Sequence, residues 1–176
     1  MQVIIENVNR TINDWIDQLP GYTYEQLCLK PGPENWSLGQ VYMHLIDDTR
    51  WYYQQIEQCL LHPDHATEEI SKAAKNMFAA NDLGDVQITG DPFAAENMAQ
   101  PEGIAQLKAD MQALKAETND LWKRVIVAEE IGKSKHPGLG YLDPYQWFRH
   151  TEIHMRHHLK QKARIDDFLK TSTFNS

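Results

Sequence analysis

The sequence predicts an all-α protein, an antiparallel four-helix bundle with a long connection between its second and third helices. Four segments place apolar residues at alternating intervals of three and four, which is the spacing of one apolar stripe on a helix. Start and stop signals bound these segments, and apart from the brief run at residues 85–89 no alternating apolar and polar pattern competes with them. Four helices with one stripe each are what a bundle requires.

The first helix is expected over residues 3–19, where Pro20 and Gly21 stop it. A short helical turn is expected at residues 24–28. The stripe of the first helix consists of Ile5, Val8, Ile12, Trp15 and Leu19.

The second helix is expected over residues 37–61, because Ser37 and Gln40 have the spacing of a capping box. Its inward face consists of Val41, His44, Leu45, Asp48, Trp51, Tyr52 and Ile56. The third helix is expected over residues 103–127. Its stripe consists of Ile104, Leu107, Met111, Leu114, Thr118, Leu121 and Val125.

The fourth helix is expected over residues 143–169. Asp143 has the position of a cap, Pro144 that of the first helical residue, and Gln146 completes a second capping box. Its stripe consists of Trp147, Thr151, His154, His158, Gln161, Ile165 and Phe168. Residues 171–176 are expected to be frayed.

The connections between these helices differ in length. About forty residues, 62–101, separate the second and third helices, and a structureless loop of that length is uncommon in a compact domain. An additional short helix is therefore expected at residues 67–80, which leaves 81–101 irregular. Residues 136–142 are expected to form a tight turn that contains glycine.

Length, charge and cysteine content restrict the class of protein. A chain of 176 residues is expected to form a single domain over residues 1–176. The net charge of −8 disfavours nucleic acid and anionic membrane surfaces as partners. No apolar run reaches the ~18 residues of a membrane span, and Glu6 interrupts the apolar start, so no signal peptide is expected. Since only Cys28 and Cys59 occur, no disulfide framework is expected, and the compartment is predicted to be the cytoplasm.

Three histidines form a candidate metal site. His154 and His158 are four residues apart and therefore lie one turn apart on the inward face of the fourth helix, while His44 lies on the inward arc of the second. Three imidazoles leave a coordination position open for water or substrate, as in catalytic zinc sites. The simpler interpretation is that they are core histidines with hydrogen-bond partners. Three convergent rings favour the metal.

Asp48 and Gln161 share faces with the three histidines. Asp48 is the candidate catalytic residue, as a general base, a fourth ligand or a partner of a ligand; the simpler interpretation is an exposed acid beside Asp47. Gln161 could orient a metal ligand, although a purely structural role is favoured.

The remaining histidines are expected to lie away from the metal. His150 is placed beside the stripe rather than on it, and His157 is expected to point away from His154. The loop residues His62 and His65 are expected to be exposed. His136 would approach the site only if its loop folds inward. Core or pocket-wall positions are expected for Trp36, Trp51 and Trp147.

Taken together, these residues resemble the DinB/YfiT-like family of metal-dependent bundle proteins, over most of the chain and in the order of that family. The final helix and the glycine turn before it are the most specific part of the resemblance. The residues that carry it are Pro33, Trp36, Ser37, His44, Leu45, His136, Pro137, Gly140, Leu142, Trp147, His154, His158, Leu159 and Gln161.

The resemblance implies an up-down-down-up bundle, usually dimeric, with His44, His154 and His158 as metal ligands. Family members include thiol-dependent S-transferases, a mycothiol-dependent isomerase and hydrolases, and many have no assigned activity. The association of the family with DNA damage describes expression rather than nucleic-acid binding. A homodimer with a small-molecule substrate is therefore expected.

Two classes of function follow from the sequence. A metal-dependent enzyme would use three neutral imidazoles, which leave the charge of a divalent ion uncompensated, to activate water for hydrolysis or a low-molecular-weight thiol for S-transfer. Zinc or nickel suits imidazole ligands best, and manganese is a further candidate. The alternative is a non-catalytic binding or interaction module with a structural metal or none. An open coordination position would favour the enzyme.

Overall fold

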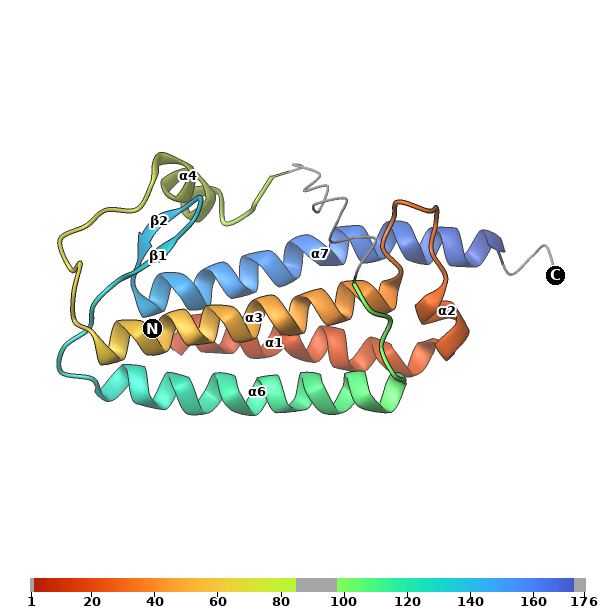
Figure 1. Cartoon of the computed structure of the whole chain (residues 1–176), viewed down its shortest axis with the longest axis horizontal. Coiled ribbons are helices and arrows are strands. Elements are labelled where there is room, and N and C mark those ends of the chain that lie inside the picture. Colours follow the sequence, from red (N-terminus) through yellow and green to blue (C-terminus); the bar gives the residue numbers. More distant parts are fainter. Residues whose placement is uncertain (1, 85–97, 173–176) are drawn as a thin grey trace.

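The computed structural model describes residues 2–84 and 98–172, and this part of the chain is mostly helical (Figure 1). The expected all-α class is thereby confirmed. The alternating run at residues 85–89 lies outside the described residues. In chain order the elements are α1 (Gln2–Gln18), the 3-10 helix η1 (Leu19–Gly21), α2 (Tyr24–Cys28), α3 (Leu38–Leu61), α4 (Lys72–Ala80), α6 (Ile104–Val127), β1 (Ser134–His136), β2 (Gly140–Leu142) and α7 (Pro144–Ser172).

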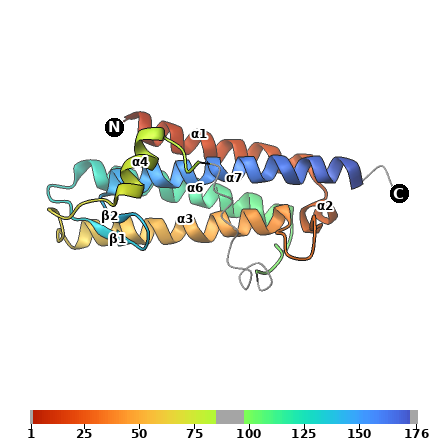
Figure 2. The same ribbon diagram turned by 90° about the horizontal axis from the view of Figure 1, so that it is seen from above.

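Four long helices lie side by side and form the body of the molecule (Figures 1 and 2). In Figure 1, α1 and α7 run from left to right, whereas α3 and α6 run in the opposite direction. Both α1 and α3 pack against both α6 and α7. The border between α3 and α7 is therefore lined by the stripes predicted for the second and fourth helices, which correspond to α3 and α7.

The predicted stripes supply much of the core. Every predicted stripe residue of α1 is buried, and Val8, Ile12 and Trp15 have no exposed surface. In α6 the stripe is buried from Leu107 to Val125, and the Thr118 hydroxyl within it is hydrogen-bonded to a tyrosine of α3. Burial of such residues is the main favourable contribution to folding. None of the described helices has both the length and the apolar character needed to cross a membrane.

Side-chain caps begin α3 and α7 where the sequence predicts them. The backbone N–H of Gln40 donates to Ser37 Oγ at 3.2 Å, and the N–H of Ser37 donates back to the Gln40 side chain at 3.0 Å. Asp143 and Gln146 form the same reciprocal pair, with both distances 2.9 Å. These caps fix the starts of the two helices that carry the candidate metal site.

Replacing either cap residue by alanine should destabilise the fold. Ser37→Ala or Asp143→Ala leaves backbone N–H groups in the first turn of the helix without an acceptor, and we expect each to lower the free energy of unfolding by about 0.5–2 kcal/mol. Urea denaturation monitored by circular dichroism measures this loss. Ser172→Ala, in the last turn of α7, is the matched control and should change stability little. Unchanged unfolding free energies in both cap variants would show that the caps do not contribute.

The connection after α3 differs from the prediction. The extra helix expected at residues 67–80 begins only at Lys72, capped by Ser71. The chain just before it pairs instead with the hairpin of β1 and β2, since Ile70 forms a bridge with Gly140. The backbone N–H of Ser71 also donates to Leu139 O at 2.8 Å. These long-range bonds satisfy the backbone polar groups that a longer helix would otherwise have paired.

Gly140 permits the close approach of these two segments. Its φ of +81° lies in the left-handed region, and a Cβ there would lie 2.8 Å from Ser71 N. The predicted glycine turn is consequently a short antiparallel hairpin, in which His136 pairs with Gly140. The hairpin places His136 over the start of α7.

Candidate metal centre

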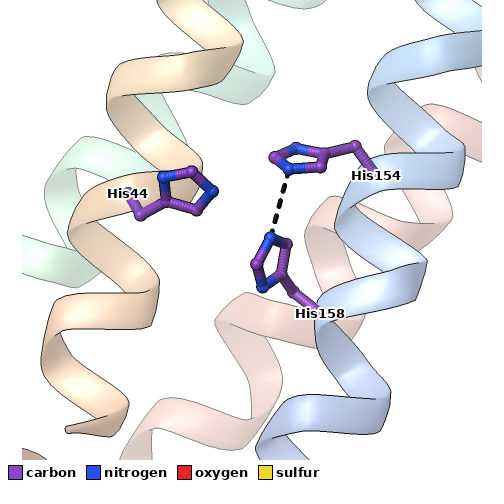
Figure 3. Close-up of side chains that lie close together, drawn as sticks. All are labelled: His44, His154 and His158. Atoms are coloured by element: carbon purple, nitrogen blue, oxygen red, sulfur yellow. Dashed lines mark hydrogen bonds between the residues drawn. The ribbon is translucent and has the colours of Figure 1, made fainter. Parts of the chain in front are cut away.

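Two neighbouring helices bring the three predicted histidines together (Figure 3). His154 and His158 come from successive turns of α7, and His44 faces them from α3. One ring nitrogen from each lies within 4.8 Å of the other two. His154 and His158 are only 6% and 5% exposed, whereas the His44 side chain keeps 17% of its surface. The site is therefore buried from the α7 side and reachable from the α3 side.

Gln161 determines which nitrogen His158 presents to the centre. The Nδ1 atom of His158 lies 2.7 Å from Gln161 Oε1, an oxygen that can only accept a hydrogen bond. Nδ1 therefore carries the proton, and Nε2 of the neutral ring keeps its lone pair. Gln161 thus holds the His158 ring through its side-chain oxygen, the contact that an orienting role requires.

Tyr52 likewise determines which nitrogen His154 presents to the centre. Its hydroxyl lies 3.2 Å from Asp48 Oδ2 and 3.4 Å from His154 Nδ1. The single hydroxyl proton goes to the ionised carboxylate, so the hydroxyl oxygen accepts from Nδ1–H of His154. This leaves the lone pair of His154 on Nε2. Chains of this kind, from carboxylate to histidine, are typical of metal sites.

The two Nε2 atoms of His154 and His158 lie 3.1 Å apart (Figure 3). With both Nδ1 protons committed elsewhere, two lone pairs point at the same space, which a cation between them stabilises. Two nitrogens bound to one zinc at about 2.0–2.1 Å in tetrahedral geometry lie about 3.3–3.4 Å apart. The donor set therefore fits a divalent ion, with the third nitrogen, from His44, within 4.8 Å of the other two.

Burial keeps these imidazoles neutral. It lowers the pKa of His44 to about 4 and that of His158 to about 3, in the latter case with a contribution from His44. The pKa of His154 is also lowered well below its usual value, first by burial and then by the neighbouring histidines. Neutral rings are the form that binds metal. At neutral pH the centre therefore offers lone pairs rather than positive charge.

Asp48 lies at the open side of the centre. Its Oδ2 atom is 3.5 Å from His44 Nε2 and 3.9 Å from His154 Nε2, and its side chain is 38% exposed. Burial raises the pKa of this carboxyl group to about 6, against the opposing effect of the hydrogen bond from Tyr52. Asp48 therefore contacts both the histidines and the solvent, as a residue that exchanges a proton with an entering molecule must.

The structure corrects the placement of His150. The sequence interpretation put it beside the stripe, but it is 4% exposed and its ring stacks on that of His154 at 5.9 Å. Residues at i, i+4 and i+8 drift by only about 40° per step, so three of them remain inside a stripe that is about 100° wide. The repeated spacing of four from His150 to His158 was the signal that could have identified it.

The histidines outside this row lie mostly where they were expected. His62 and His65 are exposed. His157 is half-buried, and its ring contacts that of His158 at 5.6 Å, without belonging to the metal-ligating group. His136 is carried inward by the hairpin, and its ring lies 5.0 Å from that of His150.

The three tryptophans expected in the core or in a pocket wall differ in burial. Trp147 has no exposed surface and confirms the core position. Trp36 is half-buried and packs its ring 4.8 Å from that of His44. Trp51 is 37% exposed, so a core position for it was wrong.

Removing the partner of His158 should weaken metal binding. We expect Gln161→Leu to lower the affinity for Zn²⁺ or Ni²⁺ by about 10- to 100-fold, because the ring loses the acceptor that holds it in position. Gln161→Glu retains an acceptor at the same reach and is the matched control, expected to bind nearly as tightly as the wild type. Isothermal titration calorimetry measures both. Equal losses in the two variants would contradict an orienting role.

Comparison with known proteins places the chain in a family. Neither a curated protein nor a solved structure matches the sequence. A family model does match, that of the DinB superfamily, and it covers residues 5–161, which include all three histidines of the centre. The chain therefore belongs to the DinB superfamily.

Proposed function

We propose that this protein is a metal-dependent enzyme in which His44, His154 and His158 hold one divalent ion. The observation that carries the proposal is the 3.1 Å separation of the two Nε2 atoms, with an oxygen that can accept a hydrogen bond beside each opposite nitrogen. Zinc or nickel is the proposed ion, with manganese as a further candidate.

A divalent ion held by three neutral ligands would supply Lewis acidity and lower the pKa of a water or thiol. The residues of the chain contribute position and proton transfer. Asp48 Oδ2, on the open side, accepts the proton of the nucleophile, and Tyr52 holds this carboxylate toward His154 through its hydroxyl group. The indole of Trp36 packs on His44 and keeps solvent from one face of that ligand.

Two reactions use this arrangement. In S-transfer, a low-molecular-weight thiol loses its proton and its sulfur attacks an electrophilic carbon, from which a leaving group departs. In hydrolysis, water attacks the carbonyl carbon of a small ester or amide, and the alcohol or amine leaves. Both need a nucleophile next to Asp48. Uncharged ligands preserve the full positive charge of the ion, which suits a thiolate.

We extend the proposal to the whole molecule. Residues 1–176 form one domain, an up-down-down-up four-helix bundle, and this is supported by the opposite directions of the α1/α7 and α3/α6 pairs in Figure 1. The protein acts in the cytoplasm as a homodimer on a small molecule. Neither nucleic acid nor a membrane is a partner, and the net charge of −8 supports this.

The test is turnover by metal-loaded protein. Zinc- and nickel-loaded samples are assayed with an electrophile in the presence and absence of a low-molecular-weight thiol, and with a panel of small esters and amides. Thiol-dependent loss of the electrophile supports S-transfer, and thiol-independent cleavage supports hydrolysis. Absence of turnover, together with a large fall in melting temperature on chelation, would favour a binding module with a structural metal.

A further inference from the structure

Next to the candidate metal centre, a cluster of aromatic rings lines the border between α3 and α7. We call it the aromatic subsite. It consists of Trp51 and Tyr52 on α3, His136 on β1, and Trp147 and His150 on α7. Ring centroids within it lie 4.9–6.2 Å apart. Two of its rings contact His154 of the centre: that of Tyr52, with centroids 5.7 Å apart, and that of His150, which stacks on it at 5.9 Å.

Trp51 is the exposed member of the subsite. It follows His44 by seven residues and Asp48 by three, so all three lie on one face of α3. Along the helix axis, Trp51 is about 10 Å from His44 and about 4.5 Å from Asp48. An indole that is 37% exposed, next to a solvent-reachable carboxylate, offers a flat apolar surface to a molecule whose polar end reaches the centre.

His150 lies behind this surface with unmet hydrogen-bonding capacity. It is 4% exposed, and neither of its ring nitrogens has a hydrogen-bond partner among residues 2–84 and 98–172. A buried polar group without a partner is costly, and such groups call for an explanation such as a bound ligand or water. The ligand histidines of the centre differ in this respect, since His158 is paired with Gln161.

His136 adds a hydrogen-bond donor to the subsite, and its contacts determine which ring nitrogen carries the proton. The backbone N–H groups of Gly138 and Leu139 both donate to its Nδ1, at 3.1 and 3.2 Å. The neutral ring therefore carries its proton on Nε2. Within the described part of the chain this N–H has no hydrogen-bond acceptor, and the residue is half-exposed beside Trp51. The subsite thus combines an aromatic platform with unused polar atoms.

We infer that the aromatic subsite binds a flat aromatic group of the substrate, with a hydrogen-bond acceptor at its far end, while the other end of the substrate reaches the metal. This inference rests on the proposed metal centre and adds the substrate class to it. Trp51 stacks on the aromatic ring, and His136 Nε2–H donates to the acceptor. The free nitrogens of His150 pair with the same polar group.

Matched metal-binding probes test the platform. Cinnamohydroxamate and crotonohydroxamate carry the same chelating head and the same double bond, and they end in a phenyl and a methyl group respectively. On zinc-loaded protein we expect cinnamohydroxamate to bind about 3- to 10-fold more tightly, the range for one aromatic contact. This preference should vanish in Trp51→Ala and be largely retained in Trp51→Phe. Val127→Ala, an exposed apolar position on α6, should leave it unchanged.

A second variant tests the polar atoms. His150→Leu removes two buried nitrogens that have no partner, so a merely structural change should leave the melting temperature equal or higher. Binding of 4-carbamoylcinnamohydroxamate should nevertheless weaken by about 5- to 10-fold, the effect of one lost hydrogen bond, while binding of cinnamohydroxamate stays within twofold.

The outcomes separate this inference from the proposed function. Equal affinities of the wild type for the two unsubstituted probes, or a phenyl preference that survives in Trp51→Ala, would overturn the aromatic subsite and leave the metal centre standing. A His150→Leu variant that melts lower and weakens all probes equally would also overturn it, since that pattern indicates a structural role. Failure of every hydroxamate to bind zinc-loaded protein would instead overturn the open metal centre, and the subsite with it.

Discussion

Replacing either ligand histidine of α7 should abolish tight metal binding. We expect His154→Ala and His158→Ala to lower the affinity for Zn²⁺ and Ni²⁺ by more than about 100-fold, since losing a partner that merely orients a ligand already costs 10- to 100-fold. Each substitution removes one of the two lone pairs that face each other at 3.1 Å. Elemental analysis of purified protein and competition titration with a chromogenic chelator measure the effect.

A matched control lies next to the site. His157→Ala removes a half-buried imidazole from the same turn of α7 that does not belong to the metal-ligating group, and it should bind metal like the wild type. Similar metal content in His154→Ala, His158→Ala and the wild type would refute the centre. Far-UV circular dichroism should show nearly unchanged helix content in all variants, because apolar burial rather than metal supplies most of the folding energy.

Chelation distinguishes a catalytic from a structural ion. If the metal served folding, its binding free energy would be folding free energy, and chelator would unfold the chain. The apolar residues of the four long helices belong to one extensive core, so we expect chelator to lower the melting temperature by only a few degrees. Unfolding of the wild type on chelation would contradict this expectation.

Much of the fold could be predicted because local sequence signals agree with the tertiary structure. The three-four spacing identified the long helices, and the reciprocal pairs at Ser37 and Asp143 fixed the starts of α3 and α7 within a residue. Both signals act over one or two turns, so no knowledge of distant contacts is needed. The end of α7 lies three residues beyond the predicted position, at Ser172, as helix ends generally vary.

The connection between α3 and α6 could not be predicted in the same way. Residues 67–71 have the composition of a helix, yet Ile70 pairs with Gly140 from a hairpin seventy residues later. The hydrogen bonds of a bridge outweigh a weak intrinsic preference for helix. No pattern within either segment reveals the other.

In the candidate site, too, some features could be predicted from the sequence and others could not. Spacing alone placed His154 and His158 on one face, and the inward arc of the second helix supplied His44. The hydrogen-bond partners of these histidines could not be read from spacing, because Tyr52 reaches His154 across a helix border and the contact of Gln161 with His158 depends on a side-chain rotamer. Helical periodicity gives the direction of a residue but not what it meets on the neighbouring helix.

Trp15 connects three helices directly behind the segment of α7 that carries His154 and His158. Its indole N–H donates to Met155 O on α7 at 3.3 Å, and its ring meets Tyr42 of α3 edge-on with centroids 4.8 Å apart. The Tyr42 hydroxyl in turn donates to Trp15 O at 2.8 Å. Trp15 has no exposed surface, and Met155 directly follows His154 in the chain. The indole therefore supports the turn of α7 that carries His154.

Trp15→Ala should be the most destabilising single substitution that we predict. We expect a loss of about 3–5 kcal/mol in the free energy of unfolding. Removal of the indole leaves a cavity between α1, α3 and α7, and the Met155 carbonyl loses its additional donor. Trp15→Phe retains most of the ring and should cost clearly less, and Val3→Ala, 64% exposed on the same helix, should cost under about 0.5 kcal/mol. Urea denaturation of metal-free protein measures all three, so that no contribution of a bound ion enters. A Trp15→Ala variant as stable as Val3→Ala would show that α1 does not support α7. A large loss, together with the modest effect of chelator, would show that packing behind the ligands, rather than the ion between them, holds the site in place.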